Sequence, residues 1–294
     1  MSTPATDDLL RPRRSVLYMP GANARALEKA QQLPADALIL DLEDSVAPDA
    51  KDSARAQVCE AAGSGAYGHR EVTIRCNAID TPWHEADVVA IATSGAAAVV
   101  VPKVDRREDV EDVDAALRAA GAPDDLAVWA MVETPLAVAN VAQIAAHPRL
   151  AVLVVGTNDL AKELQAEHVP GRAPLQHALQ AFVLGTRIAG KVVLDGVFND
   201  LDDAEGFEAE CIQGMQWGFD GKTLVHPRQL EPANRTWAPT EDAIAHARRV
   251  ISAFEEAEAE GRGVVLVEGR MVENLHVEQA RRTLAVADAV AGLG

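Results

Sequence analysis

The sequence predicts a (β/α)8 TIM barrel followed by a C-terminal helical extension or lid. Eight apolar runs of strand length alternate with helix-like patterns, and this alternation favours a parallel barrel over an open sheet. The runs are mostly continuous rather than alternating in polarity, which is typical of parallel strands buried on both faces. A chain of 294 residues accommodates one such barrel without a second large domain.

The first four strands are expected at 15–19, 37–42, 71–75 and 96–101. Pro20 and Gly21 close the first strand, and Asn23 can cap a helix that runs to about residue 33. The second strand ends in an acidic cluster that contains Asp41, Glu43 and Asp44. Both the acidic cluster and Arg75, at the end of the third strand, are therefore expected at the same rim of the barrel.

The last four strands are expected at 127–132, 151–155, 192–194 and within 218–225. Helices over about 174–189 and 207–217 separate the later strands. Four polar residues near strand ends are interpreted as structural supports at the barrel rim: Lys103, Asp195, Lys222 and His226.

Two neighbouring strands lead directly into carboxylates. Glu133 follows the run A-V-W-A-M-V, and Asp159 follows A-V-L-V-V within the segment G-T-N-D-L. Active sites of parallel barrels lie where strands meet the loops that follow them, so the two acids are placed to share a divalent cation. Hard cations such as Mg²⁺ take oxygen ligands and keep waters that a substrate can replace. The alternative is that either acid only caps its helix.

The chain is divided by the sequence into three parts. Residues 1–13 are expected to form a flexible N-terminal tail, residues 14–232 the catalytic barrel, and residues 233–294 a helical lid or oligomerisation extension. Three prolines between 227 and 239 indicate a linker. A long helix at 240–260, a hairpin-like segment and a final helix at 271–290 follow.

Composition excludes several classes of function. A net charge of −18 disfavours nucleic-acid and anionic-membrane partners on electrostatic grounds. The three cysteines are scattered, and neither a signal-peptide order nor an apolar run of transmembrane length is present. Dinucleotide, Walker, zinc-hydrolase and serine-hydrolase motifs are also lacking. A soluble cytoplasmic protein is therefore expected.

Ordered segments along nearly the whole chain resemble the HpcH/HpaI aldolase superfamily, in its citrate lyase beta-subunit-like branch, which includes malyl-CoA lyases. The matching segments are S-V-L-Y-M-P-G-A-N, L-I-L-D-L-E-D-S-V-A, V-T-I-R-C-N, V-V-P-K-V, M-V-E-T-P, V-G-T-N-D-L, L-D-G-V and G-F-D-G-K-T-L-V-H-P.

This resemblance implies a TIM barrel in which Glu133 and Asp159 hold Mg²⁺, with Mn²⁺ as the alternative ion. It implies that Arg75 acts in catalysis and grips the acyl group, because arginine can bind a carboxylate in a bidentate manner. An internal ion pair of Arg75 with Glu43 or Asp44 is the alternative. The remaining implied site residues are Gly156, Thr157 and Asn158 at the substrate, and Glu43 and Asp44 behind Arg75 and the metal-bound water.

The resemblance further implies that Tyr18, Arg25 and Lys29 contact CoA. Two basic residues on one helix are also common on an ordinary solvated face, so this assignment depends on the family. A catalytic carboxylate in the C-terminal segment of malyl-CoA lyase-like members is usually Asp in M-I-D or M-V-D. Here the run is M-V-E-N, which makes Glu273 the candidate acid/base, shared with a neighbouring subunit of a trimer or hexamer. A solvent-exposed Glu273 near a helix N-cap is the alternative.

The leading functional hypothesis is a Mg²⁺-dependent lyase that reversibly cleaves a malyl-CoA-like 3-hydroxyacyl-CoA into an acyl-CoA and an α-oxo acid. A malyl-CoA or citramalyl-CoA thioesterase is the first alternative, because the same groups could hold a water against the thioester carbonyl. A citrate lyase beta subunit that acts on a carrier-protein thioester is the second. A non-catalytic metabolite-binding protein is the remaining class.

Overall fold

The computed structural model describes residues 9–293, so residues 1–8 of the expected N-terminal tail lie outside the described part. Two compact units are present. One spans Arg13–Thr236, and the other combines the described residues of Met1–Pro12 with those of Trp237–Gly294.

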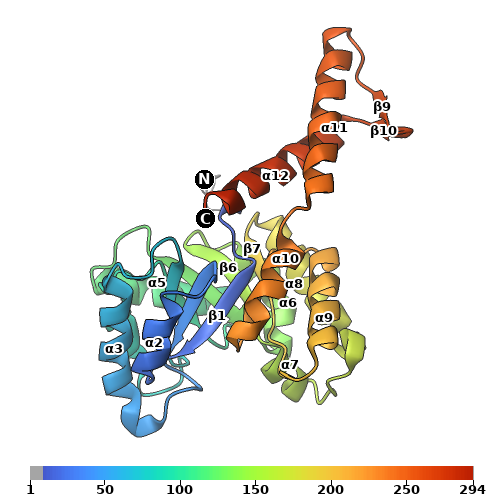
Figure 1. The fold of residues 1–294 in the computed structure, drawn as a ribbon. Helices are drawn as coiled ribbons and strands as arrows, with labels where there is room; N and C mark the ends of the chain where they lie inside the picture. The colour runs from blue at the N-terminus through green and yellow to red at the C-terminus, as the bar shows by residue number, and fades with distance from the viewer. Residues whose placement is uncertain (1–8, 294) are drawn as a thin grey trace. The chain divides into compact units, whose positions relative to one another are not determined.

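The larger unit is a closed barrel of eight parallel strands, which confirms the predicted fold class (Figure 1). Every strand pairs with the next one along the chain, and the eighth pairs with the first. The strands are β1 (Ser15–Pro20), β2 (Ala37–Asp41), β3 (Glu71–Arg75), β4 (Ala98–Val101), β5 (Ala127–Val132), β6 (Leu150–Val155), β7 (Val192–Asp195) and β8 (Gly221–Leu224). All residues of β2, β3 and β4 are buried, as continuous apolar runs predict.

Helices surround the outside of the barrel (Figure 1). They are α2 (Ala24–Ala30), α3 (Lys51–Gly63), α4 (His84–Ile91), α5 (Arg107–Ala119), α6 (Pro135–Ala145), α7 (Thr157–Glu163), α8 (Gln176–Ile188), α9 (Ala204–Trp217) and α10 (Leu230–Trp237), with short 3-10 turns η1 (Pro48–Ala50), η2 (Pro170–Leu175) and η3 (Pro227–Gln229). Asn23 caps α2 by accepting a hydrogen bond from the Ala26 N–H, as its residue type predicts.

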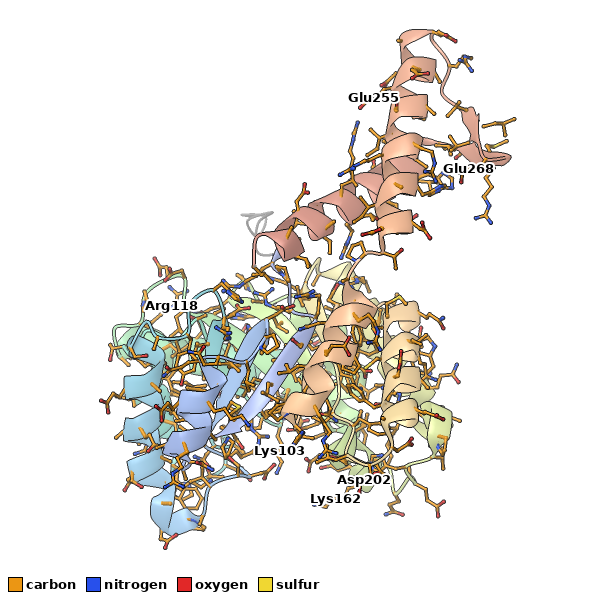
Figure 2. All side chains as sticks on the ribbon, viewed as in Figure 1. Lys103, Arg118, Lys162, Asp202, Glu255 and Glu268 are labelled. Carbon is orange, nitrogen blue, oxygen red and sulfur yellow. The ribbon has the colours of Figure 1, made fainter. Side chains whose placement is uncertain are left out.

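The two ends of the barrel differ in their chemistry. At the amino ends of the strands, Arg13 forms a buried ion pair with Glu71 at 2.6 Å, and its guanidinium lies 5.5 Å from the ring centroid of the buried Trp129. This end is therefore packed. Figure 2 shows Lys103 at the opposite end, the carboxyl ends of the strands, where the polar loops gather.

Two local predictions need correction. The proline-containing segment after β8 is not an irregular linker, because α10 (Leu230–Trp237) forms there. Pro232 lies in the first turn of that helix, where a missing N–H breaks no helical hydrogen bond. The final helix begins at Asn274 rather than Met271, since residues 270–272 pair as a strand.

The smaller unit has its own core. It contains the helices α11 (Glu241–Ala259) and α12 (Asn274–Ala291) and an antiparallel hairpin of β9 (Val265–Val267) and β10 (Arg270–Val272). Phe254, Val267 and Val277 are among its buried apolar residues. Glu268, labelled in Figure 2, accepts from His246 and forms an ion pair with Arg249, which ties the hairpin to α11. Among residues 9–293, no helix is long and apolar enough to cross a membrane.

Candidate active site

Arg75 and Asp41 form the central ion pair at the carboxyl end of the barrel. The two residues are partners in the register of β2 and β3, so their side chains project to the same side of the sheet. Arg75 Nε lies 2.6 Å from Asp41 Oδ1 and Arg75 Nη2 lies 2.8 Å from Oδ2, a bidentate geometry. Only 8% of Arg75 and 3% of Asp41 are exposed. Asp41 is thus a principal partner that the sequence reading did not assign to Arg75.

Of the two acids that the alternative interpretation paired with Arg75, Glu43 forms a close ion pair with it and Asp44 lies farther away. Glu43 Oε2 lies 2.6 Å from Arg75 Nη1, whereas the nearest oxygen of the exposed Asp44 is 3.6 Å away. Burial would raise the pKa of Asp41, but the Arg75 guanidinium outweighs it and lowers that pKa below its ordinary value. The register of β2 with β3 sets this pairing, and the sequence alone does not show that register.

Burial raises the pKa of Glu43 to about 7, because desolvation outweighs the attraction of Arg75. The folded protein therefore holds a proton on Glu43 more tightly than the unfolded chain does. The stability that this proton supplies is complete below the unfolded pKa of about 4.5 and is lost as the pH rises through about 7.

Replacing Glu43 by glutamine is expected to flatten this part of the pH dependence of stability. In metal-free buffer, the free energy of unfolding of the native protein should fall relative to that of Glu43→Gln by about 3 kcal/mol between pH 5 and pH 8. Urea denaturation of both proteins across this range measures the difference. Parallel stability curves would show that Glu43 titrates normally.

Tyr18 lies beneath the same guanidinium. The Arg75 guanidinium carbon is 5.0 Å from the centroid of the Tyr18 ring, within the range of a cation–π contact. The Tyr18 hydroxyl is directed at Met131 Sδ at 3.7 Å. Burial raises the pKa of the Tyr18 phenol well above its ordinary value, so the hydroxyl stays protonated.

Glu133 is a buried carboxylate held by backbone geometry. Only 3% of it is exposed, and its Oε1 accepts a hydrogen bond from the Lys103 N–H at 2.8 Å. Lys103 has a positive φ of 54°, a conformation that is uncommon for residues other than glycine and often found at functional sites. Gly156 is required beside it, since a Cβ at that position would lie 2.1 Å from Glu133 Oε2.

Neither strand-end acid is the N-cap residue of the helix that follows it. Thr134, not Glu133, caps α6 by accepting from the Ala137 N–H. Asp159 lies in the first turn of α7, and its charge contributes to the pKa of Glu133. Burial is the main reason that this pKa is raised to about 7. The neighbouring carboxylates of Glu43 and Asp159 also raise it, whereas the hydrogen bond from the Lys103 N–H and the charge of Arg75 lower it.

A cavity of about 400 Å³, termed the site cavity, joins these groups. It is lined by residues of six strands and the loops that follow them: Tyr18, Met19, Pro20, Asp41, Asp44, Ser45, Arg75, Met131, Glu133, Val155, Gly156, Thr157, Asn158, Asp159, Val197, Asn199, Thr223 and Val225. The structure therefore brings together Tyr18, Arg75, both strand-end acids and the G-T-N segment. Such a cavity at the carboxyl ends of barrel strands is where barrel enzymes carry their active sites.

The donor set of the site cavity fits a hard divalent cation. Residues 9–293 contain no group of three or more His, Cys, Asp or Glu that could hold a metal. Mg²⁺, however, is commonly held by one or two carboxylates and completes its shell with waters and substrate oxygens. Glu133 and Asp159 provide two carboxylates on one cavity. The absence of a Cβ at Gly156 leaves room for the Glu133 carboxylate, since a Cβ there would lie 2.1 Å from Oε2.

Several predicted residues lie elsewhere. Arg25 and Lys29 are exposed on α2 and do not line the site cavity. Glu273 belongs to the smaller unit, where it is the N-cap residue of α12 and its N–H donates to His276 Nδ1 at 3.1 Å. Its role as an acid/base stays a prediction.

The rim residues differ in their surroundings. Asp195 and Lys222 are fully buried and lie 3.1 Å apart in an ion pair. Arg172, which the sequence reading did not single out, also pairs with Asp195 at 2.7 Å. His226 caps η3 by accepting from the Arg228 N–H.

A closed parallel barrel with buried acids and a guanidinium on a cavity at its carboxyl end has the architecture of a TIM-barrel enzyme. The family model of HpcH/HpaI aldolase/citrate lyase matches residues 14–227. The chain belongs to this family and is an enzyme of it.

The chain is similar to named proteins over nearly its whole length. A (3S)-malyl-CoA thioesterase of Cereibacter sphaeroides is 51% identical over 95% of this chain and 96% of the relative. The citrate lyase subunit beta of Escherichia coli is 38% identical over 95% and 94% of the two chains. The crystal structure of CitE from Mycobacterium tuberculosis in complex with magnesium, acetoacetate and coenzyme A matches with a TM-score of 0.75 and 28% identity, over 93% of this chain and 97% of CitE.

The lyase hypothesis is wrong on these findings. Four Cereibacter relatives, which are between 49% and 51% identical to the chain, are all (3S)-malyl-CoA thioesterases. A thioesterase is a hydrolase, which agrees with the alternative interpretation of the sequence. The motifs that the sequence shares with the family do not distinguish cleavage of a carbon–carbon bond from cleavage of a thioester.

Proposed function

We propose that this protein is a thioesterase that hydrolyses (3S)-malyl-CoA or a closely similar carboxylated CoA thioester. The observation that carries the proposal is the similarity of about half of all residues, along nearly the full chain, to the (3S)-malyl-CoA thioesterases. The site cavity supports it, because acids and a guanidinium face one space of small-molecule size. An α-oxo acid is not a product of hydrolysis and has no place in the proposed reaction.

Arg75 is proposed to orient the free carboxylate of the acyl group. Its contacts with Asp41 and Glu43 do not use every N–H group that a guanidinium carries. The bidentate bond to Asp41 prevents the guanidinium from rotating, so its remaining donors are preorganised for an anion. The role of Asp41 is therefore to position Arg75, with Glu43 and Asp44 beside it.

Glu133 and Asp159 are proposed to hold Mg²⁺, or Mn²⁺, as the sequence indicates. When bound there, the ion would supply Lewis-acid polarisation of an oxygen and charge stabilisation in the transition state. Gly156, Thr157 and Asn158 line the cavity next to these acids and are proposed to contact the acyl group. The magnesium in the CitE complex supports this proposal.

Tyr18 is proposed to contact the CoA thioester within the site cavity, and Arg25 and Lys29 to contact its phosphates. An exposed pair of cations on α2 would offset the repulsion between a phosphate-bearing ligand and a protein of net charge −18. Glu273 is proposed as the general base that takes a proton from the attacking water. The protein is proposed to form a trimer or hexamer in which Glu273 acts in the active site of a neighbouring subunit. It is also proposed to be cytoplasmic.

Product analysis tests the proposed reaction directly. The purified chain is incubated with (3S)-malyl-CoA and Mg²⁺, thiol release is followed with a thiol reagent, and the products are separated by chromatography. Free CoA and malate should form in equal amounts, because hydrolysis breaks only the thioester bond. Acetyl-CoA together with glyoxylate, or unreacted malyl-CoA, would contradict the proposal. Acetyl-CoA, which lacks a free carboxylate, is the control substrate and should react more slowly.

A further inference from the structure

A second cavity, termed the side cavity, adjoins the site cavity and has a volume of about 620 Å³. Its walls come from the segment between α7 and α8, the loop after β7, and α9. Three residues, Thr157, Val197 and Asn199, line both cavities. The two cavities are therefore neighbours that share these residues in their walls.

Arg172 projects a buried donor group in the wall of the side cavity. Only 5% of the residue is exposed. Its Nε donates to Gln213 at 2.9 Å and its Nη1 to Asp195 at 2.7 Å, whereas Nη2 has no hydrogen-bond partner among the described residues. Buried polar atoms are nearly always paired with protein, water or ligand. Nη2 is thus a buried donor that the described residues leave unpaired.

The backbone holds Arg172 in a strained conformation. Arg172 has a φ of 55°, a left-handed conformation that costs energy for a residue with a side chain. The ion pair with Asp195 and a guanidinium position 5.3 Å from the ring centroid of Trp217 hold it there. Strain of this kind persists where the surroundings over-determine it, and it clusters at ligand-binding positions.

Thr157 provides a second unpaired group between the two cavities. The residue is 3% exposed, and its Oγ1 finds no hydrogen-bond partner within residues 9–293. A hydroxyl can donate and accept. The side cavity therefore offers a guanidinium donor and, at its border with the site cavity, a hydroxyl.

The charges of the side cavity select an uncharged ligand. Three carboxylates, Asp200, Asp203 and Glu210, line it with the single guanidinium of Arg172, so an anion would meet net negative charge. The ion pair of Arg172 with Asp195 already satisfies much of its charge. A neutral molecule that both accepts from Nη2 and hydrogen-bonds to a carboxylate matches these groups, and water is the smallest such molecule.

We propose that the side cavity holds the water that the thioesterase reaction consumes and passes it to the site cavity past Thr157. This inference rests on the proposed hydrolysis. In the proposed reaction the CoA thioester occupies the site cavity, so the water needs an entrance that the substrate does not block. In the reaction the water oxygen forms a C–O bond to the thioester carbon and the C–S bond breaks. The products are the carboxylate and the CoA thiol, with one water proton ending on sulfur and the other released.

Filling the side cavity tests this role. Ala209 lines the side cavity but not the site cavity, and Ala204, on the same helix, lines neither. Ala209→Leu is expected to lower kcat for (3S)-malyl-CoA hydrolysis about tenfold with little change in KM, because substrate binding is untouched while water delivery is obstructed. The matched control Ala204→Leu should retain both constants. Val169→Phe, from the segment between α7 and α8 that also lines the side cavity, should likewise lower kcat with little change in KM if Ala209→Leu folds poorly.

A crystal structure of the full chain supplies a readout that does not depend on activity. Ordered water within hydrogen-bond distance of Arg172 Nη2, displaced in Ala209→Leu, is the expected result. A protein acceptor on Nη2, a dry cavity, or native kcat in folded variants with a filled cavity would overturn the proposal. If the native protein hydrolyses no malyl-CoA, the proposed function fails, and the crystal structure still decides whether the cavity holds water.

Discussion

Replacing Glu133 by glutamine is expected to lower malyl-CoA hydrolysis about 10³-fold while leaving the barrel folded. The amide keeps the size of the carboxyl group and can still accept from the Lys103 N–H. It removes the negative charge that the proposed Mg²⁺ site shares with Asp159. Steady-state thiol release measures turnover, and calorimetric titration with Mg²⁺ should show affinity reduced by at least about 100-fold.

The same substitution should not destabilise the protein. Burial holds the pKa of Glu133 at about 7, so its ionisation opposes folding as the pH rises through that value. In metal-free buffer at pH 8, Glu133→Gln is therefore expected to be more stable than the native protein, by up to about 3 kcal/mol. Glu108→Gln, an exposed acid on α5, is the control and should change neither turnover nor Mg²⁺ affinity. Native turnover and native Mg²⁺ affinity in Glu133→Gln would contradict the assignment of Glu133 to the Mg²⁺ site.

Replacing Arg75 by methionine is expected to damage both stability and turnover. Asp41 and Glu43 would lose their shared guanidinium while remaining buried, and breaking a buried ion pair costs about 3–5 kcal/mol. Turnover should fall together with stability, because the same guanidinium is proposed to orient the substrate. Arg75→Lys should recover only part of each loss, since an ammonium cannot make the bidentate bond to Asp41. Urea denaturation and thiol release measure the two effects.

The pH dependence of the free energy of unfolding tests whether the Asp41–Arg75 pair causes the stability loss in Arg75→Met. Arg75 lowers the pKa of Asp41 below its ordinary value, so the stability of this pair is present above the unfolded pKa and is lost as the pH falls through the folded pKa. The stability gap between the native protein and Arg75→Met should accordingly narrow in acid. Arg118→Met, which breaks an exposed pair with Asp114, should leave the free energy of unfolding unchanged. A constant gap in acid would exclude the Asp41 pair as its source.

The fold was largely predictable because its signals are local. Eight apolar runs bounded by Pro, Gly and acidic residues define strands that are buried on both faces, and the structure closes them in chain order. Prediction failed where a local signal was ambiguous. Pro232 resembled a linker signal, yet proline is also accepted in the first turn of a helix. Met271 has a side chain suited to a helix, but its pairing with Leu266 places it in a strand.

The candidate site was only partly predictable. Glu133, Asp159 and Arg75 follow from their positions at strand ends, because parallel strands bring those ends to one rim. Arg172 could not be found in this way, since it belongs to η2, far from any strand end in sequence. Neither could the choice of Asp41 as the main partner of Arg75, because three acids lie within four residues of one another.

The sequence by itself determined the barrel, the family and the set of polar groups at the strand ends, because periodicity and strand-end chemistry are local properties of a chain. Tertiary structure decided which of those groups meet. The register of β2 with β3 pairs Asp41 with Arg75, and the missing side chain at Gly156 leaves room for the Glu133 carboxylate. Two separate loops enclose a second cavity around Arg172. These outcomes depend on distances between residues remote in sequence, which no local pattern encodes.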